Sequence, residues 1–127
     1  INDYKKYINI NVKINLTHTE LVTELHSHDI LAFPSIVEGF GHVILEAMSV
    51  GLPVLCTPNT AGPDVFINGN EGIIVPIRNV VAIAEKIEYF INHKKELESM
   101  GVSAGQTARV FTWEKFRDSI VQFYTNS

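Results

Sequence analysis

Short apolar runs alternate with helical patterns along most of the chain, and this alternation is typical of βα units that build a parallel sheet. Residues 29–33 predict a buried strand, residues 53–57 and 72–75 predict two further strands, and residues 12–16 predict another short strand. We therefore predict an α/β fold of about four strands and about six helices. The sheet is Rossmann-like, parallel and flanked by helices, and residues 1–127 form a single domain.

Polar residues at the helix ends predict where the helices begin and stop. Thr17 and Glu20 form a capping box for a helix that runs to about His26. Gly51 is a stop signal for an apolar helix over residues 42–50. Asn79 caps an amphipathic helix, and the apolar residues of this helix form one stripe that is expected to face the core. The stripe consists of Val80, Ile83, Ala84, Ile87 and Ile91. Further helical segments are predicted at residues 4–8, 64–67, 94–100, 103–109 and 112–124.

The helix over residues 42–50 is apolar around most of its circumference. Its polar residues His42, Glu46 and Ser49 share one narrow stripe, which faces either solvent or a crevice. The helix follows a strand and a loop containing Gly39 and Gly41, so it starts at the carboxyl edge of the sheet, where α/β proteins bind ligands. Free amides at a helix N-terminus attract phosphate, which favours the crevice.

Charge and composition limit the classes of molecule that the protein is expected to bind and the compartment in which it is expected to lie. The net charge of -4 gives no overall basic surface, which argues against nucleic acid. No apolar run is long enough to span a bilayer and no signal peptide opens the chain. The single cysteine, Cys56, is expected to be an inert core residue and fits a reducing, cytoplasmic compartment. The first residue is Ile1 rather than methionine, which suggests a piece of a longer protein.

The stretch between Lys13 and Arg78 contains no lysine or arginine but carries seven acidic residues. A phosphate at the helix start would lie between Glu38 in the loop and Glu46 in the helix. Since carboxylates repel phosphate, these two suit neutral hydroxyl groups on either side of it. A nucleotide sugar has this sequence of sugar, phosphate and sugar.

Several motifs resemble the signature of retaining glycosyltransferases of family 4, over about residues 12–125. They are Pro34-Ser35, Glu38-Gly39-Phe40-Gly41, Glu46-Ala47, Gly51, Pro53-Val54, Gly62-Pro63-Asp64-Val65, Asn68-Gly69 and residues 72–76. Glu38 and Glu46 match the family's pair of glutamates at the same spacing. Asp64 departs from the pattern, because the family often has glutamate there, and this puts the role of its loop in doubt.

The resemblance implies a site as well as a fold. Glu46 would accept hydrogen bonds from ribose hydroxyls, and Glu38, the expected catalytic-site residue, would hold hydroxyls of the donor sugar. The amides of Gly41, His42 and Val43 would meet the diphosphate, while Gly39 and Phe40 would shape the loop.

The chain would be the donor-binding C-terminal part of a two-domain GT-B enzyme for carbohydrate biosynthesis, with no cofactor and no metal. A carbohydrate or lipid-linked acceptor, and any peripheral membrane contact, would belong to a separate N-terminal domain. The family's phosphate-binding arginine and lysine would lie before Ile1.

Other interpretations stay open at this point. Glu38 could only stabilise a helix N-terminus, and Glu46 could be a solvated helix residue. His26, His28 and Asp29 would need a further ligand to hold a metal. Asn59 and Thr60 are candidates to line a sugar pocket. Aromatic residues near the end are expected in the core or a domain interface: Trp113, Phe116, Phe123 and Tyr124. The whole chain could also be a non-catalytic nucleotide-binding or interaction module, or part of a related GT-B enzyme such as an epimerase or glycogen synthase.

Overall fold

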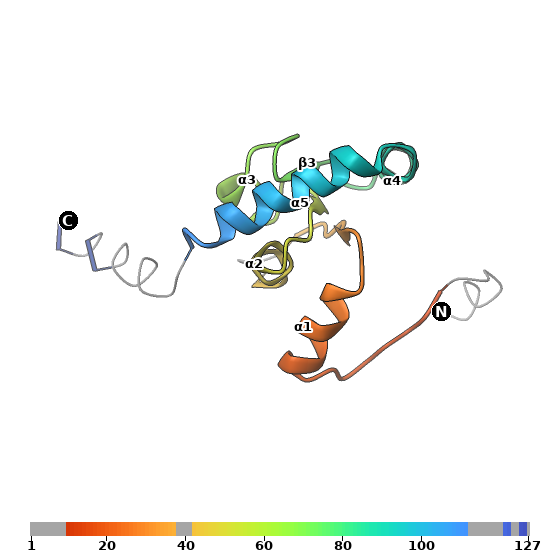
Figure 1. The fold of residues 1–127 in the computed structure, drawn as a ribbon. Helices are drawn as coiled ribbons and strands as arrows, with labels where there is room; N and C mark the ends of the chain where they lie inside the picture. The colour runs from red at the N-terminus through yellow and green to blue at the C-terminus, as the bar shows by residue number, and fades with distance from the viewer. Residues whose placement is uncertain (1–9, 38–41, 112–120, 123–124, 127) are drawn as a thin grey trace.

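The sheet of the molecule is parallel and has the order β1-β2-β3. Figure 1 shows the helices around it, with α2 beside α5. The computed structural model describes residues 10–37, 42–111, 121–122 and 125–126. Strands β1 (Leu31–Phe33), β2 (Val54–Cys56) and β3 (Gly72–Ile74) each contain three residues. Leu31 pairs with Val54, and Val54 pairs with Gly72. The predicted α/β class with a parallel sheet is confirmed.

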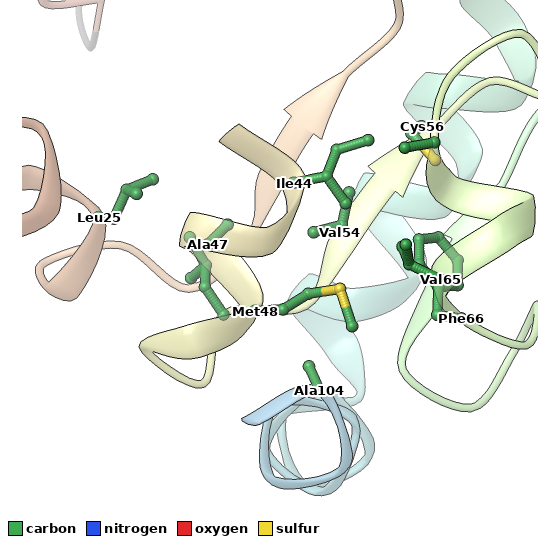
Figure 2. Packing of buried hydrophobic residues seen from close by; sticks show 11 residues of the cluster. Leu25, Ile44, Ala47, Met48, Val54, Cys56, Val65, Phe66 and Ala104 are labelled. Carbon is green, nitrogen blue, oxygen red and sulfur yellow. The ribbon is translucent and has the colours of Figure 1, made fainter. Parts of the chain in front are cut away.

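Five helices surround this sheet in the described ranges. They are α1 (His18–His26), α2 (His42–Ser49), α3 (Gly62–Val65), α4 (Val80–Asn92) and α5 (Lys94–Ala108). The core forms where α2 packs between the sheet and α5, with Met48 directed toward Ala104 of α5 (Figure 2). Ile44 and Met48 of α2 and Val54 of β2 are fully buried there. Helix α2 is therefore fixed on several sides.

The predicted helix ends at Thr17, Gly51 and Asn79 are confirmed. The amide of Glu20 donates to Thr17 Oγ1 (3.2 Å), and the amide of Thr17 donates to Glu20 Oε2 (2.7 Å). Gly51, at φ 77°, ends α2 in a Schellman motif. There the Leu52 amide donates to the Ala47 carbonyl (3.0 Å) and the Gly51 amide to the Met48 carbonyl (2.9 Å). Asn79 Oδ1 accepts from the Ala82 amide (2.9 Å).

One strand prediction is wrong, and one predicted strand is less buried than expected. Residues 12–16 form no strand, and Val12 and Ile14 are exposed. A strand needs a hydrogen-bonding neighbour, and in the described structure these residues have none. Strand β1 was expected to be buried, but Ala32 is exposed and its neighbours are half-buried. The reason is its place at the end of the sheet order, where it pairs with β2 alone.

The two helices predicted at residues 94–100 and 103–109 are one continuous helix, α5. The gap between the two predicted helices contains Gly101, and glycine is a residue type that weakens helices. Gly101 is instead buried against the end of α2: a β-carbon there would lie 2.4 Å from the Gly51 carbonyl oxygen. Glycine at 101 therefore allows the close approach of two helices rather than ending one.

The prediction that the apolar stripe of α4 faces the core is also wrong. Four of its residues are exposed: Val80, Ala84, Ile87 and Ile91. Phe90 is the buried residue of α4, and the helix contacts α5. Periodicity identifies an apolar face without showing whether a neighbour covers it. The short helix predicted at 64–67 lies two residues earlier, as α3. The helix predicted at 4–8, and that at 112–124 apart from residues 121–122, fall outside the described residues.

Candidate functional site

Helix α2 starts at the carboxyl edge of the parallel sheet. The chain leaves β1 at Phe33, enters α2 at His42 and returns through β2, which is parallel to β1. In such a crossover the N-terminus of the helix lies at the carboxyl edge of the strands. His42 and Val43 belong to the first turn of α2, and the backbone amides of a helix's first turn point toward its N-terminal end. This end of α2 is chemically suited to an anionic group.

The polar stripe of α2 faces away from the core. Ile44, Ala47 and Met48 are buried, whereas His42 and Ser49 are exposed. Glu46 lies between them, and its side chain retains 25% of its accessible surface. The Glu46 carboxylate is thus reachable by a ligand from the helix's open side.

Glu46 has a partner that the sequence did not indicate. His18 Nε2, from the first turn of α1, lies 3.5 Å from Glu46 Oε1. The two residues are far apart in the sequence, and only the packing of α1 against α2 brings them together. No spacing pattern could have revealed this contact.

The end of β2 is tied to the loop that follows β1. The hydroxyl of Thr57, a fully buried residue, donates to the Ser35 carbonyl. Asn59 Nδ2 donates to the Ile36 carbonyl (3.0 Å). Thr60 is buried and its hydroxyl donates to the Thr57 carbonyl (2.8 Å). Of the two candidates for a sugar pocket, Asn59 thus joins the loop after β2 to the loop after β1, whereas Thr60 holds the loop after β2 itself.

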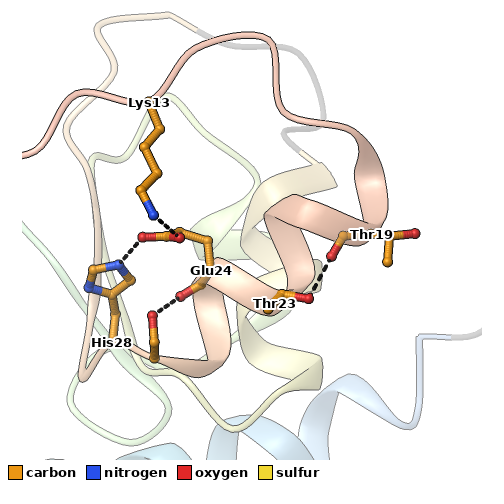
Figure 3. Close-up of polar contacts among 6 residues, drawn as sticks. Lys13, Thr19, Thr23, Glu24 and His28 are labelled. Atoms are coloured by element: carbon orange, nitrogen blue, oxygen red, sulfur yellow. Dashed lines mark hydrogen bonds and ion pairs between the residues drawn. The ribbon is translucent and has the colours of Figure 1, made fainter.

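His28, one of the two histidines near Asp29, contacts a glutamate of α1. His28 Nε2 lies 3.0 Å from Glu24 Oε1, and Lys13 Nζ lies 2.5 Å from Glu24 Oε2 (Figure 3). Hydrogen bonds from Lys13 and then from His28 lower the pKa of the Glu24 carboxyl. Across the described ranges, no three His, Cys, Asp or Glu side chains gather as metal ligands would. Cys56 is buried in the core as expected, and its burial raises the pKa of the thiol.

A family model described as "Glycosyl transferases group 1" matches residues 1–107. The chain belongs to this family. It is 34% identical over 89% of its length to the capsular polysaccharide biosynthesis glycosyltransferase CapM of Staphylococcus aureus, covering 29% of that protein. It is 31% identical over 88% of its length to an uncharacterised glycosyltransferase of Methanocaldococcus jannaschii, covering 34% of it. The chain therefore spans about a third of these relatives.

The fold of this group 1 chain matches part of the GT-B fold. The Anabaena protein HepE, determined in complex with UDP-glucose, superposes with a TM-score of 0.75 at 21% identity. The match covers 85% of the chain and 30% of HepE. No helix in the described ranges of the group 1 chain is both long and apolar enough to cross a membrane.

Some of the remaining predicted site residues of the group 1 chain lie in the segments that the structure describes, and others lie outside them. Glu38, Gly39, Phe40 and Gly41 lie outside the described residues, as do Trp113, Phe116, Phe123 and Tyr124. Asp64 is described and is exposed on α3. The structure thus brings together His42, Val43 and Glu46 on α2 and adds His18 from α1.

A buried carboxylate also lies in this group 1 chain, away from α2. Glu71 Oε2 accepts from the Ile67 amide (2.9 Å), and Glu71 Oε1 accepts from Asn70 Nδ2 and Thr107 Oγ1, both at 3.0 Å. Its side chain is 6% exposed. Three donors satisfy the carboxylate, so we assign it to the fold: it joins the loop before β3 to the end of α5.

The Thr57 contact gives a direct test of how the loops of this group 1 chain are held. Thr57→Val keeps the shape of the side chain but removes the hydrogen bond that the Thr57 hydroxyl donates to the Ser35 carbonyl. We expect the free energy of unfolding to fall by about 1–2 kcal/mol, measured by urea denaturation followed by circular dichroism. Thr23→Val on α1 is the control, because that hydroxyl donates to the Thr19 carbonyl (2.9 Å) at an exposed position (Figure 3). Equal effects of the two substitutions would contradict the structural role of Thr57.

Proposed function

We propose that this chain supplies the donor-binding part of a longer retaining glycosyltransferase, which moves a sugar from a nucleotide diphosphate sugar to a carbohydrate or lipid-linked acceptor. Membership of the glycosyl transferases group 1 family supports sugar transfer. The chain spans about a third of its curated relatives, so the acceptor side of the enzyme is assigned to sequence outside it. We propose the cytoplasm as its location, because the free, buried Cys56 suits a reducing compartment.

The observation that carries the proposal is the position of Glu46. It stands on the open side of α2, about one turn after the amides of His42 and Val43, at the carboxyl edge of the sheet. A diphosphate bound at those amides would place its nucleoside ribose within reach of the carboxylate. That HepE was determined in complex with UDP-glucose supports a nucleotide diphosphate sugar as the ligand to test.

The residues are assigned as follows. Glu46 accepts hydrogen bonds from the ribose hydroxyls, and Glu38, as the catalytic residue, holds hydroxyls of the transferred sugar. The amides of Gly41, His42 and Val43 donate to the diphosphate. Gly39 and Phe40 shape the loop around the donor. No metal is required at this site, because backbone donors and cations outside the chain balance the phosphate charge.

The reaction breaks the bond between the anomeric carbon and the diphosphate oxygen, and forms a bond from the acceptor oxygen to the same carbon. Both events occur on one face of the sugar, which retains the anomeric configuration. The proton of the acceptor hydroxyl passes to the departing diphosphate. Since negative charge grows on that diphosphate in the transition state, donors aimed at it from the start of α2 lower the barrier.

The decisive experiment measures transfer by the full-length enzyme from UDP-glucose, ADP-glucose and GDP-mannose to a panel of carbohydrate and lipid-linked acceptors. We expect one donor to give a product whose anomeric configuration, read by NMR, matches that of the donor. Addition of EDTA should leave the rate unchanged. The 127-residue chain alone should give no transfer.

An inverted product would refute the retaining assignment. Absence of nucleotide binding by the full-length protein would refute the enzyme itself, while binding without transfer would indicate a non-catalytic module.

A further inference from the structure

The contact between α1 and Glu46 joins two segments that the proposed donor site does not otherwise connect. His18 is the first residue of α1, and its Nε2 lies 3.5 Å from Glu46 Oε1. The His18 side chain retains 74% of its accessible surface and the Glu46 side chain 25%. The imidazole thus lies on the solvent side of the carboxylate, beside the open face of α2.

Positive charge is scarce in this part of the chain. No lysine or arginine occurs between Lys13 and Arg78, so the side chains there that can carry a positive charge are His18, His26, His28 and His42. His28 contacts Glu24, at the opposite end of α1 from His18. A protonated His18 is therefore placed to offset the negative charge of Glu46.

The charge of Glu46 matters for a nucleotide sugar. The carboxylate must accept hydrogen bonds from ribose while it repels the nearby diphosphate. A cation on Oε1 would reduce that repulsion, and Oε2 would remain available to a ribose hydroxyl, since a carboxylate offers two acceptor oxygens. The same cation would also restrain the rotation of the carboxylate.

We infer that His18 is a positioning residue of the donor site, which in its protonated form pairs with Glu46 Oε1, orients the carboxylate toward ribose and tightens the binding of nucleotide diphosphate sugars. This inference rests on the proposed function. Since histidine changes its charge between about pH 5 and 8, donor affinity then falls as the pH rises through this range.

The other charged groups around the pair have separate roles. On α1, the Glu20 carboxylate accepts from the Thr17 amide (2.7 Å) and is engaged in the cap. On α2, His42 precedes Glu46 by one turn on the same stripe. A positive charge at the start of α1 meets the unfavourable end of the helix dipole, and the Glu46 carboxylate, 3.5 Å from His18 Nε2, is the group that offsets this.

The test measures the dissociation constant of UDP-glucose by calorimetry at pH 5.5 and pH 8.0, with ADP-glucose and GDP-mannose as further probes. Each phosphate of a nucleotide diphosphate sugar has one ester bond and one anhydride bond and keeps a single, strongly acidic ionisable oxygen, so the probe keeps its charge over this range. The variants are His18→Gln, which is never charged, and His18→Lys, which stays charged. His28→Gln is the matched control, because His28 also pairs with a glutamate on α1.

For the unmutated full-length protein we expect binding about twofold to fivefold weaker at pH 8.0 than at pH 5.5, as for an exposed ion pair. His18→Gln should show the weak value at both pH values, His18→Lys the tight value at both, and His28→Gln the unmutated profile. An unmutated profile in both His18 variants would overturn the inference. If Glu46→Ala weakens binding while the His18 variants change nothing, only this inference fails. If no probe binds the unmutated protein, the proposed function fails with it.

Discussion

Replacing Glu46 by alanine is expected to lower kcat/KM for the nucleotide-sugar donor by about 10- to 100-fold, the equivalent of about 1.5–3 kcal/mol for hydrogen bonds to a charged group. The fold depends little on this carboxylate, because the side chain lies on the open face of α2 and its partner His18 is exposed. Alanine is also a good helix former. The loss should therefore appear in donor affinity and rate, with thermal unfolding unchanged.

Steady-state kinetics of the full-length enzyme with varied donor concentration provide the measurement. Glu98→Ala is the control, because Glu98 is an exposed glutamate on α5, away from the start of α2. We expect Glu98→Ala to match the unmutated enzyme. A value for Glu46→Ala within twofold of the unmutated enzyme would remove Glu46 from the donor site.

Replacing Gly101 by alanine is expected to lower the free energy of unfolding by about 1–3 kcal/mol, as for overpacking of a tight interior. The new β-carbon would lie 2.4 Å from the Gly51 carbonyl oxygen, which is backbone and cannot rotate away. Helix α5 and the end of α2 would have to separate. Because α2 carries Glu46, this variant should also weaken donor binding.

Gly105 provides a matched control on the same helix. A β-carbon there would meet its nearest heavy atoms at 3.7 Å, an ordinary contact. Gly105→Ala should raise the free energy of unfolding by about 0.5–1 kcal/mol through helix propensity. Urea denaturation of both variants measures the difference. Similar effects at the two positions would show that α2 and α5 do not meet as closely as described.

Local signals in the sequence predicted local structure well. The capping box at Thr17, the stop at Gly51 and the cap at Asn79 each involve residues within one turn of each other, so the sequence alone contains the interaction. The alternation of strands and helices around the parallel sheet followed from the same short-range patterns, and it placed the start of α2 at the carboxyl edge of the sheet.

Features that depend on distant neighbours could not be predicted in this way. The two helices predicted at 94–100 and 103–109 are one helix, and the residue that packs against Gly101, Gly51, lies far away in the sequence. The apolar stripe of α4 looked like a core face, although Phe90 is the residue that is buried. The same limit applies to the site: Glu46 followed from a motif, whereas the contact with His18 depends on how α1 packs against α2.

The buried Glu71 carboxylate has a consequence for motion. It fastens the loop before β3 to α5 through Thr107, and α5 in turn touches the end of α2 through Gly101. Helix α2 thus belongs to one cooperative unit with β2, β3 and α5, and local opening of that unit would break buried contacts in all of them. Helix α1, with Leu25 as its buried residue, is held less firmly. Adaptation to donors of different size is therefore expected from α1 and His18, against an α2 that keeps its position.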